Sequence, residues 1–579
     1  MDKITVERDI DVEMRDGITL ATDIYRPQGA ENCPTLVHRN PYDKSNAGSV
    51  GGLIVNPLDA AREGFAVVVQ DTRGRFESEG EWIPFVNEAD DGYDTVEWAA
   101  DRPWSNGRVG IYGASYHGVT ALQAVTADPP HLEAALAYLT GANYHDGWVY
   151  SDGAFELGFN LWWTQYLATD TVTRLDLPEA DRDAELDRLL ELTADPESVA
   201  AERPLAEGSL FSHPATTYVQ DWFDHPTYDE YWTDIDVLEG IEDVETPVLH
   251  ASGWYDLFLR SHLSLYQAIV DRGGERAREE QRFIVGPWDH EAYATLTPDR
   301  AGDRKFGYEA AGGTALMSDL SLQWFGHWLA DRDDIEDIAS VRYYQMGTNE
   351  WRTAESWPPE HSETRYYLHS DGGANTRSGS GRLTPHPPAA EPADSYEYDP
   401  TDPVPSVGGR SLHISIDDPG IKDRADVEER DDILVYTSAR LTDSLEIAGP
   451  VAVTLYASSS APDTDFTATL VDVEPDATCV PIAEGIQRAR YRESPTEVSF
   501  IEPGEIYEFS IDLQSVAHTF RTGHRLRLEV SSSNFPRFDR NPNTTAAPVE
   551  ASPDDVQAAT QNIFHTDEYP SHLTLPVRD

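Results

Sequence analysis

Three short segments carry residue types that together could perform nucleophilic catalysis. In the first, the apolar run at 109–112 leads into Gly113-Ala114-Ser115-Tyr116-His117-Gly118 and then into an apolar, helix-like stretch. A serine on a sharp turn between a strand and a helix has an exposed hydroxyl, so this context predicts a nucleophile at Ser115. The general pattern G-x-S-x-G would place its second glycine at position 117, where the sequence has His117 instead. A serine that opens a helix also commonly serves only as an N-cap.

A serine nucleophile needs a base and an acid, and candidates for both follow it in the chain order Ser, Asp, His. Asp256 ends the segment GWYD after one apolar run, and His290 ends the segment GPWDH after the next. The base accepts the serine proton, while the acid orients the imidazole and stabilises its cation. We therefore predict a catalytic triad of Ser115, Asp256 and His290.

Other side chains compete for these roles. His250 directly follows an apolar strand, which favours a packed core position, and His262 and His327 lie in helix-like segments. Asp289 immediately precedes the predicted base, so its carboxylate is expected to point away from the serine as a loop or supporting group.

Acyl transfer also requires hydrogen-bond donors for the oxyanion. One predicted donor is the backbone N–H of Tyr116, which follows the nucleophile. The second is expected on the loop after an early strand, where Tyr42 offers a phenolic hydroxyl. The alternative for Tyr42 is simple aromatic packing beside Pro41.

The elements that must position these residues suggest an α/β protein. Up to about residue 140, short apolar runs alternate with helix-like stretches, and the same style returns at 241–340, which predicts a mainly parallel sheet in two parts. Residues 141–240 are rich in Trp, Tyr, Asp and Leu and include Leu186, Leu189 and Leu190 at helical spacing, which predicts an inserted helical cap.

The remainder, residues 341–579, has the pattern of an all-β domain. Apolar residues alternate with polar ones along 451–455, 507–513 and 526–530, which indicates half-buried strands. Several such strands predict a β-sandwich of the jelly-roll type. The Gly-, Pro- and Ser-rich stretch from 371 to 409 is expected to be a long loop or meander.

Charge and composition exclude several classes of partner. The 104 Asp and Glu outnumber the 43 Lys and Arg, which gives a net charge of −61, and only four of the cations are lysines. Nucleic acid and anionic membranes would be repelled. We interpret the acidity as adaptation to a salt-rich cytoplasm, the alternative being an ordinary acidic enzyme.

No secretory signal or membrane span is expected. Two cysteines, at 33 and 479, suit neither a disulfide framework nor a four-cysteine zinc site, and no metal or cofactor is implied.

Taken together, the motifs resemble those of the cocaine esterase and Xaa-Pro dipeptidyl-peptidase family of serine hydrolases, which includes glutaryl-cephalosporin acylases and α-amino-acid ester hydrolases. The resemblance covers nearly the whole chain. The resemblance implies an α/β-hydrolase fold with a helical cap and a C-terminal jelly roll. It also implies nucleophile, base and orienting acid at Ser115, His290 and Asp256, and an oxyanion hole at Tyr42 and Tyr116. In this family the second glycine falls three residues after the serine, as Gly118 does. The matching segments are 16–27, 40–42, 70–75, 92–98, 113–118, 253–256, 286–290, 351–359 and 399–405.

One departure from the family concerns the substrate. The α-amino-acid ester hydrolases carry carboxylates two and three residues after the triad aspartate, which bind the substrate ammonium, but this sequence has Phe258 and Leu259 there. The leading expectation is therefore an esterase or amidase that takes a neutral or apolar acyl group from a small molecule. The tryptophans at 148, 162 and 163 are expected to form the core of the cap or the wall of the pocket.

Two other hypotheses remain open at this point. A dipeptidyl-peptidase would anchor a free amino terminus on cap carboxylates such as Asp146 or Asp152. A noncatalytic protein would use the jelly roll to hold carbohydrate. The sequence does not decide whether the chain is a monomer or a homodimer.

Overall fold

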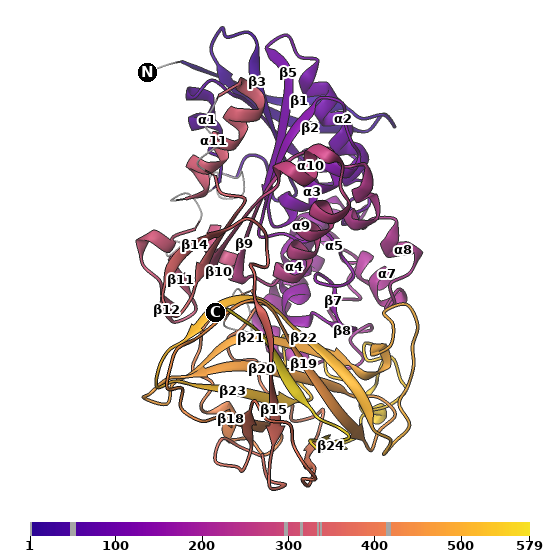
Figure 1. Ribbon diagram of the computed structural model, residues 1–579. Helices are drawn as coiled ribbons and strands as arrows, with labels where there is room; N and C mark the ends of the chain where they lie inside the picture. Colours follow the sequence, from indigo (N-terminus) through magenta and orange to yellow (C-terminus); the bar gives the residue numbers. More distant parts are fainter. Residues whose placement is uncertain are drawn as a thin grey trace.

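The apolar runs of the first half of the chain form one large mixed sheet (Figure 1). The structure is a computed structural model and describes residues 3–46, 54–293, 299–312, 316–332, 335, 338–412 and 419–578. Within these residues the central strands are mutually parallel, and antiparallel strands lie at both edges. In spatial order the strands are β1 (Ile4–Glu13), β2 (Thr19–Pro27), β4 (Ala66–Asp71), β3 (Cys33–Asn40), β5 (Ser105–Ala114), β6 (Leu132–Tyr138), β9 (Val248–Tyr255), β10 (Arg282–Asp289), β13 (Val341–Gln345) and β14 (Glu350–Ala354).

Helices cover both faces of this sheet, so its central strands are buried on both sides. The alternation along β4 sends Ala66 and Val68 into one core, and Val67 and Val69 into another. The first core lies beneath α2 (Glu88–Ala100) and α3 (Tyr116–Thr126), and the second beneath α1 (Pro57–Arg62) and α11 (Met317–Ala330). This double burial explains why the strands read as continuous apolar runs in the sequence.

A helical cap is inserted between β6 and β9. Its longest helix, α4, begins at Leu157 and ends at Arg174, and it packs beside α5 (Glu179–Ala194). Leu189 of α5 is buried, whereas Leu190 is exposed, as an amphipathic helix requires. The remaining elements of the cap are β7 (Tyr150–Ser151), β8 (Ala154–Phe155), α6 (Pro196–Ala201), α7 (Tyr218–Asp224), α8 (Glu230–Thr233) and the 3₁₀ segment η1 (Val237–Asp243).

The C-terminal part of the chain is an all-β domain at one end of the molecule, coloured orange and yellow in Figure 1. Its apolar core continues into the first domain, because Tyr255, Phe283 and Met346 pack in the same cluster as residues such as Phe466 and Ile511. Its strands are β15 (Ser362–His369), β16 (Arg382–Thr384), β17 (Asp394–Tyr398), β18 (Leu434–Ser438), β19 (Leu445–Ser459), β20 (Asp465–Val473), β21 (Cys479–Arg488), β22 (Tyr507–Phe520), β23 (Arg525–Ser531), β24 (Ala559–Phe564) and β25 (His572–Val577).

The predicted fold class, an α/β-hydrolase sheet with a helical cap and an all-β C-terminal domain, is confirmed, but two details differ from the sequence-based expectation. Strands β13 and β14 belong to the first sheet, so that sheet extends to Ala354 and the boundary expected at 340/341 falls inside it. The stretch 371–409, expected to be a long loop or meander, contains two short strands, β16 and β17. Both strands are short, at three and five residues, so turn residues dominate the local composition.

Candidate active site

Ser115 lies on the turn between β5 and α3, with a backbone φ of 56° and ψ of −131°. A positive φ is unusual for a residue with a Cβ and is typical of the strained turn that exposes a nucleophile. Among the hydrogen bonds that hold the turn, the Ser115 N–H donates to the carbonyl of Tyr138 at 3.0 Å, and Thr140 Oγ1 donates to the carbonyl of Ser115 at 2.8 Å.

The glycines on either side of Ser115 allow the close approach that this turn needs. A Cβ at Gly113 would lie 2.1 Å from the backbone of His117, and a Cβ at Gly118 would lie 2.6 Å from Thr140. Because Thr140 itself bonds to Ser115, Gly118 is needed where α3 crosses the end of β6. This contact explains why the second glycine stands three residues after the serine.

The structure brings His290 and Asp256 to Ser115 in one continuous hydrogen-bonded chain. His290 Nε2 lies 2.9 Å from Ser115 Oγ, and His290 Nδ1 lies 2.6 Å from Asp256 Oδ1. Asp256 is fully buried, and Ser115 and His290 are 7% and 3% exposed. In this arrangement the serine hydroxyl donates to Nε2 while Nδ1–H donates to the carboxylate, which is the protonation state that a general base requires.

Trp288 sets the spacing between the two loops that carry the acid and the base. A Cβ at Gly253 would lie 2.3 Å from the Trp288 carbonyl, and a Cβ at Gly286 would lie 2.2 Å from the Trp288 ring. The indole N–H donates to the carbonyl of Ala310 at 2.6 Å. The glycines of the GWYD and GPWDH segments therefore make room for Trp288, a buried residue of β10.

The two predicted oxyanion donors lie on elements next to the serine. Tyr116 is the first residue of α3, so its N–H is among those that have no acceptor within the helix. Its side chain points into the core, where the hydroxyl accepts from the Phe85 N–H at 2.7 Å and donates to Glu88. Tyr42 Oη accepts a hydrogen bond of 2.9 Å from the indole N–H of Trp163 on α4. Sequence analysis missed this bond between the cap and the Tyr42 loop.

An aromatic cluster surrounds the candidate base. The Phe258 ring packs edge-on to His290 at 5.0 Å and stacks on Trp148 at 4.0 Å. Trp163 lies 5.5 Å from Trp148, and both rings are buried, whereas Trp162 is only partly buried. Phe258 is thus a buried apolar side chain in contact with the candidate base.

The cap carboxylates considered as amine ligands are engaged by an arginine. Arg260 on α9 (Leu259–Arg272) forms ion pairs with Asp152 at 2.5 Å, Asp146 at 3.2 Å and Asp512 of the all-β domain at 3.6 Å. Burial raises the pKa of Asp152, and Arg260 opposes this shift. Arg260 therefore joins three parts of the molecule, and its role had no signal in the local sequence.

The competing residues lie in other surroundings. His250 Nδ1 lies 3.2 Å from His262 Nε2, and His250 Nε2 lies 2.7 Å from Gln281. Burial lowers the pKa of His250 to about 4, which is typical of a neutral core histidine. His327 bonds to the carbonyl of Arg332. Asp289 accepts from the N–H of Glu291, and burial raises its pKa to about 6.

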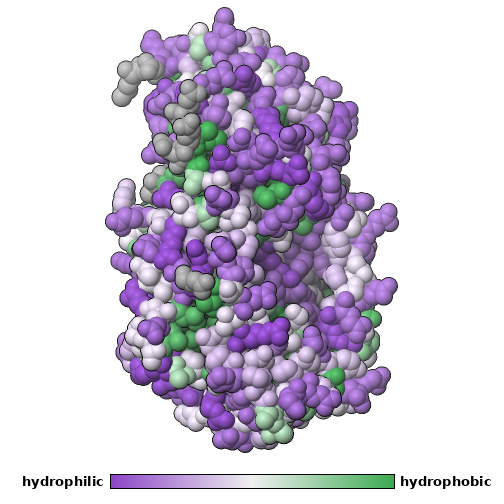
Figure 2. Space-filling model, viewed as in Figure 1, coloured by the Kyte–Doolittle hydropathy of each residue, from purple (hydrophilic) through white to green (hydrophobic). Residues whose placement is uncertain are grey.

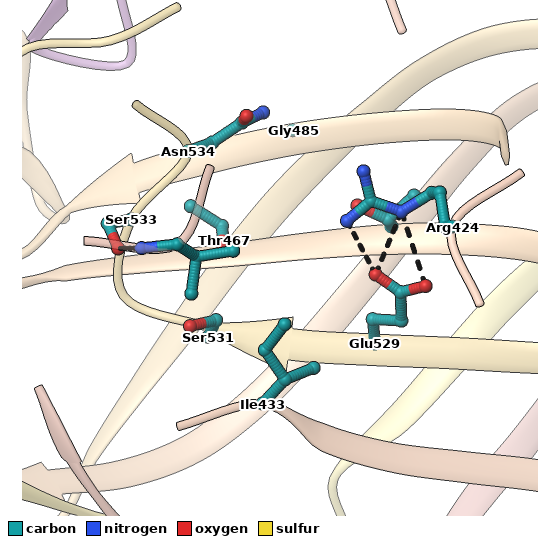
Figure 3. A pocket seen from close by; sticks show the side chains of 10 residues that line it. Arg424, Ile433, Thr467, Gly485, Glu529, Ser531, Ser533 and Asn534 are labelled. Carbon is teal, nitrogen blue, oxygen red and sulfur yellow. Dashed lines mark hydrogen bonds and ion pairs between the residues drawn. The ribbon is translucent and has the colours of Figure 1, made fainter. Parts of the chain in front are cut away.

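The all-β domain contains a polar recess that bears on the carbohydrate hypothesis (Figure 3). The Arg424–Glu529 ion pair, at 2.7 Å, lies against it with several hydroxyl side chains. Its volume of about 10 Å³ accommodates at most a single water molecule. This recess is too small to hold a sugar ring.

The residues that the structure describes include neither a metal-binding cluster nor a membrane-spanning helix. No group of three or more His, Cys, Asp or Glu in this part of the chain is arranged to hold a metal ion. No helix in the same residues is both long and apolar enough to span a bilayer.

Comparison with known proteins places this architecture in a family. Residues 16–292 match the family model described as X-Pro dipeptidyl-peptidase (S15 family), and residues 334–574 match that of the X-Pro dipeptidyl-peptidase C-terminal non-catalytic domain. The chain is 38% identical over 576 residues to a cocaine esterase from Rhodococcus sp. (strain MB1 Bresler), covering 99% of this chain and 98% of that protein. The chain belongs to this family of serine hydrolases. Its reaction is hydrolysis of an ester or amide bond, as predicted.

Solved structures agree with this assignment. An aminopeptidase from a marine sediment Thaumarchaeota archaeon superposes with a TM-score of 0.81 at 25% identity, covering 100% of this chain and 97% of that one. An α-amino acid ester hydrolase superposes with a TM-score of 0.79 at 26% identity and the same coverage. The names of these relatives span esters and peptides, so membership alone leaves the preferred acyl group open.

Proposed function

We propose that this protein is a serine esterase that transfers a neutral, apolar acyl group first to Ser115 and then to water. The observation that carries the proposal is the unbroken chain from Ser115 through His290 to Asp256. In the first step Ser115 Oγ attacks the ester carbonyl while its proton passes to His290 Nε2. Asp256 stabilises the resulting imidazolium, which then protonates the leaving alcohol. A water molecule, deprotonated by His290, then attacks the carbonyl of the acyl-enzyme. The bond from that carbonyl to Ser115 Oγ breaks, His290 returns the proton to Oγ, and the acid is released.

In this proposal two hydrogen-bond donors stabilise the negative charge that develops on the carbonyl oxygen. The Tyr116 N–H at the start of α3 also benefits from the positive end of the helix. The Tyr42 hydroxyl is the second donor. The bond from Trp163 supports this role, because an indole N–H that donates to Tyr42 Oη directs the phenolic proton away from the indole. Such fixed donors stabilise the transition state without reorganising during the reaction.

The preference for a neutral acyl group rests on what surrounds the triad. A substrate with a free ammonium needs an available carboxylate, yet Phe258 is apolar and Arg260 engages the nearby Asp146 and Asp152. Phe258 and Trp148 are buried next to His290 and make the surroundings of the triad apolar, which favours an uncharged acyl group. The family model named for X-Pro dipeptidyl-peptidases keeps peptide hydrolysis as the alternative.

A substrate comparison tests the proposal. The purified enzyme is assayed with p-nitrophenyl benzoate, p-nitrophenyl acetate, an α-amino acid p-nitrophenyl ester and an Xaa-Pro-anilide. We expect the highest kcat/KM for the benzoate and no measurable cleavage of the anilide. A preference for the free-amino ester or the anilide would contradict the neutral-acyl assignment. A fluorophosphonate that labels the wild type but not Ser115→Ala identifies the nucleophile.

We further propose a salt-rich cytoplasm as the working environment. The net charge of −61 on a surface of 21269 Å² corresponds to about one net negative charge per 350 Å². The face seen in Figure 2 is predominantly hydrophilic, in keeping with this charge. Cell fractionation of the native host tests the location. A homodimer remains a proposal that sedimentation analysis in molar salt can decide, with a mass of one chain counting against it.

A further inference from the structure

His117, the residue that replaces glycine in the G-x-S-x-G pattern, has an oxygen atom next to each of its ring nitrogens. Nδ1 lies 2.9 Å from the carbonyl oxygen of Ala114, and Nε2 lies 3.0 Å from Oδ1 of Asn40. The residue is 4% exposed. Each oxygen can only accept, and a neutral imidazole carries a single N–H. In either neutral tautomer, one nitrogen would therefore hold its lone pair against a lone pair of oxygen at hydrogen-bond distance.

The orientation of the Asn40 amide is constrained from its other side. The backbone N–H of Tyr42 donates to the same Oδ1 at 2.8 Å, in a turn that joins residues two apart. Exchanging the amide oxygen and nitrogen would let a neutral His117 accept from Asn40. The same exchange would set the amide NH₂ against the N–H of Tyr42, leaving a partly buried donor without this acceptor. The arrangement that satisfies all three contacts has protons on both nitrogens of His117.

From this geometry we propose that His117 is held as an imidazolium and is a positioning residue for the oxyanion hole, acting through Asn40 on Tyr42. The role in catalysis rests on the proposed function, because it takes Tyr42 as an oxyanion donor. The cation fixes Asn40 with a charge-assisted hydrogen bond, and Asn40 fixes the turn that carries Tyr42. The loop of Tyr42 is thereby held by two hydrogen bonds: one joins His117 of α3 to Asn40, and the other joins Trp163 of the cap to Tyr42.

Two rings pack against the imidazole of His117. His38 of β3 stacks on it at 4.6 Å, and the Tyr42 ring approaches it edge-on at 5.2 Å. His38 Nδ1 lies 3.1 Å from the carbonyl oxygen of Tyr112, to which it donates because that oxygen can only accept. Stacking orients the His117 ring, so its two nitrogens stay directed at Ala114 and Asn40 rather than rotating away.

The charge is tested on the wild-type enzyme by spectroscopy. Protein labelled with ¹⁵N-histidine is observed at about pH 7.5, where an exposed imidazole is mostly neutral. The signals of His117 are identified by their disappearance in His117→Gln. We expect both nitrogens of His117 to carry protons at this pH. A lone-pair nitrogen in His117 would overturn the proposal, whatever the activity of the variants.

The positioning role is tested with a double-mutant cycle. We expect His117→Leu to lower kcat for an aryl ester by about 10- to 100-fold while KM changes by less than about 3-fold, and His117→Gln, which can still donate to Asn40, to recover part of that loss. In a Tyr42→Phe background, where the hydroxyl is already absent, His117→Leu should lower kcat by less than about 3-fold further. Losses that multiply independently, or equal losses for Leu and Gln, would overturn the positioning role.

Failure of this inference is distinguishable from failure of the proposed function. If a fluorophosphonate did not label Ser115, the proposed function would fall and the positioning role with it. The charge of His117 would still be decided by its nitrogen signals. If His117→Leu does not fold, the labelled wild type and the His117→Gln variant provide the same decision.

Discussion

Replacing Tyr42 with phenylalanine removes a single oxygen atom and should produce two effects that can be measured separately. The first is catalytic. If the hydroxyl donates to the oxyanion, its loss should lower kcat by about 10²- to 10³-fold, equivalent to about 2.7–4 kcal/mol, with little change in KM. The second effect is structural, because Trp163 loses the acceptor of its indole N–H. Trp163 is 1% exposed, so the orphaned donor should reduce the free energy of unfolding by about 1–3 kcal/mol.

Trp163→Phe is the matched control. It breaks the same hydrogen bond from the other side and leaves the Tyr42 hydroxyl in place. We expect this variant to be destabilised at least as much as Tyr42→Phe, because it also loses buried ring volume, but to lose no more than about 10-fold in kcat. Steady-state hydrolysis of p-nitrophenyl benzoate and unfolding in urea supply both quantities. A Tyr42→Phe enzyme that is less stable but keeps kcat within about 3-fold of the wild type would refute the oxyanion role and leave Tyr42 as a packing residue.

Other parts of the structure lead to further expectations. Ser115→Ala and His290→Ala should each lower kcat by about 10⁴- to 10⁶-fold with an unchanged circular dichroism spectrum, and either variant retaining a tenth of the activity would contradict the triad. The raised pKa of Asp289, about 6, means that the folded state binds this proton more tightly than the unfolded state. Its stabilising contribution is therefore present below about pH 4 and lost as the pH rises through about 6, so Asp289→Asn should be the more stable protein at pH 8, by up to about 3 kcal/mol in urea unfolding. Arg260→Gln should lower the free energy of unfolding by about 2–3 kcal/mol in dilute buffer, less than the loss of a fully buried ion pair because the aspartates are partly exposed. A loss of stability that does not depend on salt would argue against an ionic role for Arg260. The melting temperature should rise between about 0.05 and 4 M KCl, and a flat or falling curve would refute adaptation to salt.

The residues of the candidate triad were recognisable from the sequence because each stands at the end of a strand with its own local pattern. Ser115, Asp256 and His290 each follow an apolar run and a glycine, and the carboxyl ends of parallel strands meet at one edge of a sheet. Local pattern and chain order were therefore enough to predict that the three would be neighbours. The α/β class and the all-β C-terminal domain were predictable for the same reason, since burial on two faces or on one face leaves a different periodicity in the sequence.

Tertiary packing alone decided two other features of the site and its surroundings. Trp163 bonds to Tyr42 across 121 residues, and Arg260 reaches Asp152 across 108. The residues next to Trp163 and Arg260 in the sequence do not predict which side chain each of them contacts. The availability of Asp152 for a substrate amine could not be judged from the sequence, because an aspartate has the same local sequence whether its carboxylate faces solvent or an arginine. Strands β13 and β14 likewise alternate as strands of either sheet would, and only the pairing of β13 with β10, and of β14 with β13, assigns them to the first. Such contacts depend on how the cap, the sheet and the all-β domain pack together, and short-range patterns carry no information about that packing.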